Sequence, residues 1–157
     1  MNGDGRHEEI HPEAVWMQVR SVEVDRTTRM VGVILARLVD GDLLFLPVEQ
    51  TDADVIASAR RACSADPALG VLVRAIAGFG TRPTYVVLEL EALHSGPGHA
   101  RMRSAQVVLD DGSTLRCDPA KALALSVRVG VPVRSARPVA PSWFVPAEQP
   151  QLLPAHA

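Results

Sequence analysis

Apolar and polar residues alternate along the first part of the chain with the two-residue period of half-buried β-strands. This alternation predicts a strand from Val15 to Val24. Two denser apolar runs, 30–39 and 43–48, flank Asp40-Gly41-Asp42, a sequence that favours a tight turn between antiparallel strands. The beginning of the chain therefore predicts a β-meander.

Three later segments have the 3.6-residue period of amphipathic helices instead. The first begins near Thr51, which we expect to cap it, and the second occupies residues 67–77. The third occupies residues 119–129. Asp118 is a favourable N-cap for it, and Gly130 suits the left-handed position after its last turn.

The remaining segments predict more strands. Residues 85–93 are rich in β-branched side chains and favour a strand, although their Glu-Leu-Glu-Ala ending is also compatible with a helix. Residues 100–117 form a second predicted hairpin that turns at Asp110-Asp111-Gly112, and residues 131–135 form a last short strand. This order predicts a single α+β domain over residues 14–137, with a mixed or antiparallel sheet and about three helices.

Both ends of the chain differ from this core. Residues 1–13 are polar and predict a flexible N-terminal tail, while residues 138–157 contain five prolines and predict a Pro-rich C-terminal tail. We expect Trp143 and Phe144 to pack on the domain or on a neighbouring subunit. A fragment of residues 15–144 is accordingly expected to keep the thermal stability of the full chain.

Composition narrows the function classes. The chain has 157 residues and a formal net charge of −2, which excludes a protein that holds nucleic acid by overall charge alone. No apolar run approaches membrane-spanning length and no hydrophobic signal region precedes the core, so we expect a cytoplasmic protein without membrane contact. Cys63 and Cys117 lack the paired spacing of a zinc site and predict reduced thiols.

Two segments carry a resemblance to a known family. Leu46-Pro47-Val48 matches a Leu-Pro-Ile segment, and residues 119–128 match the apolar positions of the motif Arg-Pro-Ser-Asp-Ala-Ile-Ala-Leu-Ala-Leu-Arg. Together with the order of elements, they resemble the bifunctional nuclease family, small bacterial domains associated with DNase and RNase activity. The polar positions differ, because Asp118 stands where the family has Arg, Ala120 where it has Ser, and Lys121 where it has Asp.

The resemblance implies hydrolysis of DNA or RNA phosphodiester bonds at a cleft beside the last predicted helix. Asp54 takes the place of a family glutamate, and with Asp118 and Lys121 it forms the expected catalytic set. Arg82 and Arg128 are the expected substrate-binding residues. A nuclease of this kind would call for a divalent metal or a base, but the sequence identifies neither the metal nor a ligand set for it.

A second function class stays open because the charges at the last predicted helix are inverted. The same scaffold would then act without nuclease activity, as a partner-binding regulator or as a small-molecule pocket protein or enzyme. Lys121 and the helix N–H groups would hold a small anionic ligand, unless Lys121 only pairs with Asp118 one turn away. In either class we expect a homodimer, as is common for small mixed domains with an apolar surplus.

Other polar residues have less specific patterns. The His-Glu-Xaa-Xaa-His match at 7–11 precedes a proline and lacks an apolar face, so it predicts a tail without stoichiometric zinc. His94 and His99 flank a Gly-Pro-Gly loop, where they are general-base or metal-ligand candidates or simply solvated. Six arginines offer either a phosphate-binding surface or dispersed solvated charge: Arg60, Arg61, Arg74, Arg82, Arg101 and Arg103.

Overall fold

The computed structural model describes residues 14–60, 67–93, 99–147 and 152–154, which form a single α+β domain, as predicted. The elements in chain order are β1 (Trp16–Asp25), β2 (Val31–Arg37), β3 (Leu43–Pro47), α1 (Gln50–Ser58), α2 (Pro67–Gly78), β4 (Pro83–Ala92), β5 (Ala100–Leu109), β6 (Thr114–Cys117), α3 (Pro119–Val129), β7 (Val133–Ser135), the 3₁₀ helix η1 (Pro141–Trp143) and β8 (Leu152–Pro154). Every strand that the sequence predicts is present, and the segment expected at 85–93 is a strand up to Ala92 rather than a helix.

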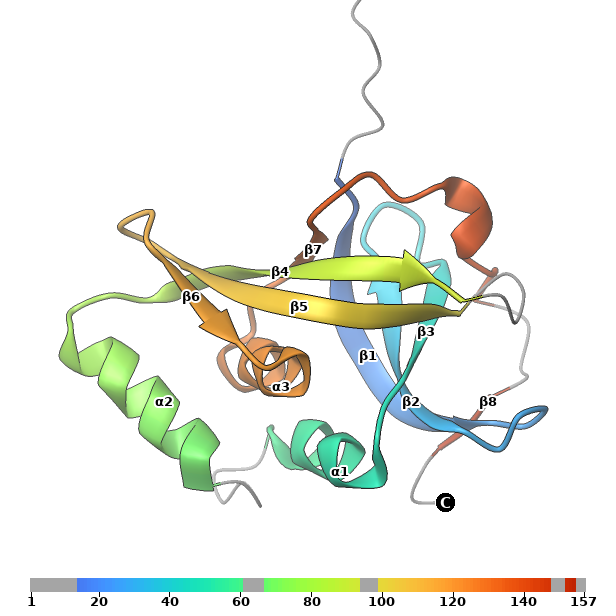
Figure 1. The fold of residues 1–157 in the computed structure, drawn as a ribbon, viewed down its shortest axis with the longest axis horizontal. Helices are drawn as coiled ribbons and strands as arrows, with labels where there is room; N and C mark the ends of the chain where they lie inside the picture. Colours follow the sequence, from blue (N-terminus) through green and yellow to red (C-terminus); the bar gives the residue numbers. More distant parts are fainter. Residues whose placement is uncertain (1–13, 61–66, 94–98, 148–151, 155–157) are drawn as a thin grey trace, which may run out of the picture.

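The sheet consists of two antiparallel meanders joined by β7, in the order β3-β2-β1-β7-β4-β5-β6, with β8 added to β1. β7 runs antiparallel to β1 and parallel to β4, so the sheet is mixed. In Figure 1 the long strands β4 and β5 cross in front of β1, β2 and β3. The far edge of the sheet returns to the other meander, where Phe45 of β3 bridges His99 just before β5.

The helix α3 packs in the interior of this curled sheet. Five of its residues, 120 and 122–125, are alanines and leucines that are each at most 4 % exposed. Small alanine side chains let the helix approach the strands closely, and the two leucines fill the space between them. They belong to one core cluster with Met17, Val86 and Val133 of the surrounding strands.

The ends of the helices confirm one predicted cap and correct another. Asp118 caps α3 by accepting a hydrogen bond from the Lys121 N–H at 3.4 Å, and Gly130 has the expected left-handed conformation with φ of 74°. The predicted cap at Thr51 is wrong, because α1 already begins at Gln50. The carbonyl of Glu49 accepts the first helical hydrogen bond from the Ala53 N–H at 2.9 Å.

The Pro-rich segment after β7 packs on the domain along its described length. Phe144 is 7 % exposed, which confirms the expected packing of this residue, and Val145 exchanges two main-chain hydrogen bonds with Leu43 of β3. Further along, β8 pairs with residues 23–25 of β1. The fragment 15–144 would therefore lose the pairing of Val145 with β3 and that of β8 with β1. Residues 1–13, including the His-Glu-Xaa-Xaa-His match, lie outside the described residues.

Candidate functional site

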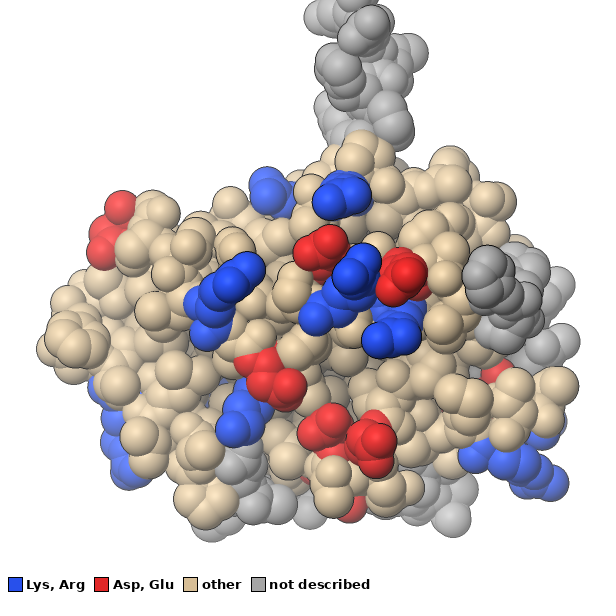
Figure 2. All heavy atoms as spheres, in the orientation of Figure 1, with Lys and Arg blue, Asp and Glu red and all other residues tan. Residues whose placement is uncertain are grey.

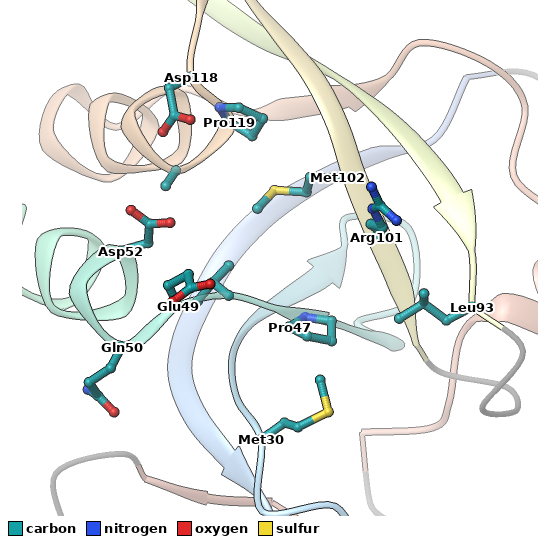
Figure 3. A pocket seen from close by; sticks show the side chains of 12 residues that line it. Met30, Pro47, Glu49, Gln50, Asp52, Leu93, Arg101, Met102, Asp118 and Pro119 are labelled. Atoms are coloured by element: carbon teal, nitrogen blue, oxygen red, sulfur yellow. The ribbon is translucent and has the colours of Figure 1, made fainter.

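A pocket of about 670 Å³ opens where the first turns of α1 and α3 meet the strands β3 and β5 (Figure 3). Its lining combines acidic, basic and apolar side chains. The lining residues are Met30, Pro47, Val48, Glu49, Gln50, Asp52, Leu93, Arg101, Met102, Asp118, Pro119 and Ala120. Pockets of this size accommodate small organic ligands or one end of a larger substrate.

Both segments that carry the family resemblance contribute to this one pocket. Residues 47–48 lead from β3 into α1, and residues 118–120 begin α3, about 70 positions later in the chain. Each helix starts at the pocket with a carboxyl residue in its N-cap position, Glu49 for α1 and Asp118 for α3. Acidic residues are common at helix N-termini, where their charge complements the helix dipole.

Asp52 is half-buried, whereas Glu49 and Asp118, the other two carboxyl residues of the lining, are exposed. Figure 3 shows its side chain directed toward Asp118 across the gap between the two helices. Burial raises the pKa of Asp52, and the negative charges of Asp118 and Glu49 raise it further, against a smaller opposite effect of Lys121. Asp52 therefore retains its proton to a higher pH than an ordinary aspartate.

The opposite wall of the pocket carries its single arginine. Arg101 stands at the beginning of β5, across from the two aspartates in Figure 3. Met30, Met102 and Leu93 form an apolar surface beside it. With three carboxyl groups and one guanidinium, the lining is acidic overall. In Figure 2, which has the orientation of Figure 1, red atoms gather over α1.

The structure brings together only part of the predicted catalytic set. Asp118 lines the pocket, but Asp54 is exposed on another side of α1 and accepts a hydrogen bond from Gln50 Nε2 at 3.0 Å. Successive helical residues are rotated by about 100°, so Asp52 and Asp54 point to different sides. Lys121 is exposed and lies outside the lining, where its main-chain N–H completes the α3 cap.

The two predicted substrate-binding residues lie away from the pocket. Arg82 precedes β4, and its main-chain N–H and carbonyl bond to Asp110 at the hairpin turn. That turn is at the opposite end of the β4–β5 ladder from Arg101, since Pro83 pairs with Leu109 there. Arg128 is in the last turn of α3, roughly 15 Å along the helix from its capped end at 1.5 Å per residue.

The remaining predicted arginines do not form one surface in the described part of the chain. Arg60 lines a separate hollow of about 390 Å³ near the end of α3, and Arg74 is exposed on α2. Arg103 pairs with Glu91 at 3.8 Å, while Arg61 lies outside the described residues. Arg101 is thus the arginine of this group that meets the candidate site.

His99 has a structural environment that the loop context did not indicate. Its Nε2 lies 2.6 Å from Oδ2 of Asp25, whose side chain is only 5 % exposed. Burial alone would raise the pKa of Asp25, but the hydrogen bond with His99 and those from the Thr27 and Thr28 main chain lower it overall. The expectation of a solvated histidine is wrong here, because the curl of the sheet brings the end of β1 against the start of β5. His94 lies outside the described residues.

The described residues offer neither a cluster of metal ligands nor a reactive thiol. No group of three or more His, Cys, Asp or Glu side chains in the described ranges is arranged to hold a metal ion. Cys117 is a free thiol at the end of β6, and burial raises its pKa, with a further contribution from Asp118. A thiol with a raised pKa is a weak nucleophile at neutral pH.

Comparison with models of known protein families finds no match to this chain, and comparison with curated proteins finds no match either. The resemblance to the bifunctional nuclease family therefore stays a prediction. Among the described residues no helix is long and apolar enough to span a membrane. The sequence pattern did not single out Glu49 and Asp52, although Glu49 directly follows the Leu-Pro-Val segment and Asp52 lies about one helical turn after it.

Proposed function

We propose that this chain is a divergent bifunctional-nuclease-like domain that hydrolyses phosphodiester bonds in the pocket between α1 and α3. The observation that carries the proposal is the shared location of the two segments that resemble the family, since both line this pocket. Asp118, at the start of α3, then acts together with Glu49 and Asp52 at the start of α1. This combination gives the site a set of acids of its own.

The two aspartates suit complementary roles in hydrolysis. The raised pKa of Asp52 suits its carboxyl group to donate a proton to the leaving oxygen. The Asp118 carboxylate accepts a proton from the attacking water, whose oxygen forms a new bond to phosphorus as the bond to the leaving oxygen breaks. Arg101 binds the phosphate oxygens and compensates for the negative charge that develops on them.

A divalent metal does not fit the present arrangement. The carboxylate oxygens of Glu49, Asp52 and Asp118 are of the type that Mg²⁺ prefers. They are nevertheless not grouped closely enough, in the described part of the chain, to hold such an ion. We therefore assign the proton transfers to the protein groups alone.

Substrate binding by Arg101 is testable with a matched arginine. In hydrolysis of a fluorescent single-stranded oligonucleotide, Arg101→Gln is expected to raise KM about tenfold, the effect of losing about 1.4 kcal/mol of a charge-assisted contact. Arg82→Gln, at the other end of the same ladder, is expected to leave KM unchanged. Equal effects of the two substitutions would contradict the proposed site, and parallel reactions with EDTA measure any dependence on metal.

A second candidate function is recognition of a small cationic molecule without hydrolysis. It is favoured by the excess of carboxyl groups over guanidinium in the lining and by the apolar surface of Met30 and Met102. Such a ligand would be attracted by the same carboxylates that repel a nucleic-acid phosphate. Binding of a panel of organic cations that is lost in Asp118→Asn, with no hydrolysis by the native chain, would favour this candidate.

We also propose that the protein forms a homodimer through α2. This helix contains a single charged residue, Arg74, and presents Val71 at 57 % exposure, with Phe79 at 86 % exposure directly after it. A second copy would cover this apolar surface. We expect the native chain to sediment as a dimer and Phe79→Asp as a monomer. The control Val39→Asp, at another exposed apolar position, is expected to stay a dimer.

A further inference from the structure

The sheet carries a row of side chains that crosses five strands on the face opposite α3. The strand register aligns Trp16 of β1 with Arg134 of β7, Arg134 with Val87 of β4, Val87 with Gln106 of β5, and Gln106 with Arg116 of β6. We call these five residues the outer row. At the usual spacing of about 4.8 Å between strands, the outer row spans roughly 19 Å.

Burial of the adjacent positions shows which face the outer row occupies. Met17, Val133, Val86 and Val107, each next to a member of the outer row, are completely buried in the core. Because successive side chains of a strand point to opposite faces, the outer row points away from the core. Its first and last members are the most accessible, with Trp16 39 % exposed and Arg116 also exposed.

A second row of three residues lies beside the first. Tyr85 of β4 pairs with Val108 of β5, which pairs with Thr114 of β6. Neither row contains an aspartate or glutamate. The acidic residues of this region lie further along β4, where Glu89 is 3.8 Å from Arg137 and Glu91 is 3.8 Å from Arg103.

Arg134 is held between the aromatic rings of the two rows. Its guanidinium carbon lies 5.2 Å from the centre of the Tyr85 ring and 5.8 Å from that of Trp16. The two rings meet edge to face with centres 5.1 Å apart. The Nε of Arg134 is buried without a hydrogen-bond partner among the described residues.

We infer that this face binds single-stranded nucleic acid, with a base stacked on Trp16 and phosphates at Arg134 and Arg116. An ordered aromatic ring beside arginines, with Glu89 and Glu91 of β4 each close to an arginine outside the two rows, has the charge and shape complementary to a strand of stacked bases and phosphates. A duplex fits poorly because its bases are already stacked on each other. This binding surface is separate from the α1–α3 pocket and does not depend on hydrolysis there.

Stacking on Trp16 gives a direct spectroscopic readout in the full chain. The sequence has two tryptophans, so Trp143→Phe leaves Trp16 as the only one. Titration of this variant with a twelve-residue oligothymidylate in about 50 mM salt is expected to quench the Trp16 fluorescence. Unchanged fluorescence at saturating oligonucleotide would overturn the inference.

Affinity measurements on labelled oligothymidylate separate stacking from general attraction. Trp16→Leu keeps an apolar side chain but removes the ring, and it is expected to weaken binding at least fivefold. The control Trp143→Leu, the same substitution at the other tryptophan of the sequence, is expected to have no effect. Equal affinities of Trp16→Leu and the native chain, or equal competition by a duplex of the same length, would refute single-strand stacking.

The phosphate contacts are tested by the salt dependence of binding. Arg116→Gln is expected to reduce the slope of log K against log salt by about 0.7, the value for one single-strand phosphate, while Arg74→Gln leaves the slope unchanged. If Trp16→Leu instead converts a dimer to a monomer in sedimentation, the face is an interface between copies and the inference is wrong. Loss of binding in Trp16→Leu without any hydrolysis by the native chain would support this inference and contradict the proposed nuclease.

Discussion

The hydrogen bond between Asp25 and His99 is expected to be a main support of the curled sheet, and removing it should destabilise the whole domain. Asp25 closes the end of β1, and its carboxylate accepts bonds from His99 Nε2 at 2.6 Å and from the Thr27 N–H at 2.8 Å. The side chains of Asp25 and His99 are only 5 % and 21 % exposed. Asp25→Ala leaves both donors without this acceptor at a site that water reaches poorly.

The size of the effect follows from these two contacts. A hydrogen bond to a charged group contributes about 1.5–3 kcal/mol, and breaking a buried pair by removing one partner costs about 3–5 kcal/mol. For a chain of this length each kcal/mol changes Tm by about 2–4 °C, so Asp25→Ala is expected to lower Tm by about 6–20 °C. Asp111→Ala is the matched control, because Asp111 accepts a similar bond from the Ser113 N–H at 2.9 Å in an exposed turn.

The pH dependence of this contribution has a definite sign. The pKa of Asp25 is lower in the folded state than its ordinary value of about 3.9, so the unfolded chain binds the proton more readily. The stabilisation is present above that ordinary value and is lost as the pH falls through the lowered pKa. Thermal denaturation of the native chain and of Asp25→Ala should therefore converge in strong acid. A Tm of Asp25→Ala within 2–3 °C of the native value at about pH 7 would refute the reasoning.

Three further substitutions test other parts of the structure by thermal denaturation. Asp52→Asn should raise Tm at neutral pH, because the folded state raises the pKa of Asp52 and so disfavours its ionised form; the gain should vanish in acid below the unfolded pKa, and a lower Tm at neutral pH would contradict the assigned environment. Gly32→Ala should cost about 1–3 kcal/mol, since the added Cβ would lie 2.5 Å from Cζ of Phe45 and 2.6 Å from the Leu46 carbonyl oxygen, whereas Gly70→Ala in α2 meets nothing within 4 Å and should stabilise by up to about 1 kcal/mol; a neutral Gly32→Ala would show that both the ring and the β3 main chain can move. Asp118→Ala should cost about 0.5–2 kcal/mol through loss of the α3 cap, and an unchanged Tm would mean that this cap contributes little.

Local sequence signals were sufficient where backbone chemistry determines the structure. Asp118, Pro119 and Gly130 define both ends of α3, and the turn at Asp110-Asp111-Gly112 appears as expected, with Gly112 at φ of 84°. These features depend on residues close together in the chain. Their prediction therefore needed no knowledge of the tertiary structure.

The candidate site was harder to predict because the fold brings its parts together. Asp54 and Asp52 are two positions apart in one helix, and which of them faces the pocket depends on where α1 begins. The predicted cap of α1, Thr51, lies two residues after the observed N-cap, Glu49, so the predicted helix did not show which aspartate faces the pocket. The family resemblance pointed to Asp54. Arg101 looked like one of six similar arginines until the curl of the sheet placed the start of β5 opposite α1 and α3.

The sequence indicated the packing of Phe144 but not the strand pairing of the Pro-rich segment. Its composition is typical of a tail, but Val145 pairs with an edge strand that would otherwise be uncovered, and Phe144 lies under the Arg37 guanidinium at 4.6 Å. An edge strand accepts such a segment through main-chain hydrogen bonds, which its sequence does not reveal.

The most direct test of the proposed active pocket compares two neighbouring aspartates of α1 in one assay. The full chain, Asp52→Asn and Asp54→Asn are incubated with a single-stranded fluorescent oligonucleotide, and the initial rates of cleavage are measured at saturating substrate. We predict that Asp52→Asn lowers kcat by about 100-fold or more, the usual contribution of a general acid, while Asp54→Asn stays within about twofold of the native rate. Cleavage that survives in Asp52→Asn and is lost in Asp54→Asn would contradict the assignment of the pocket, and no cleavage by the native chain would contradict the proposed function itself.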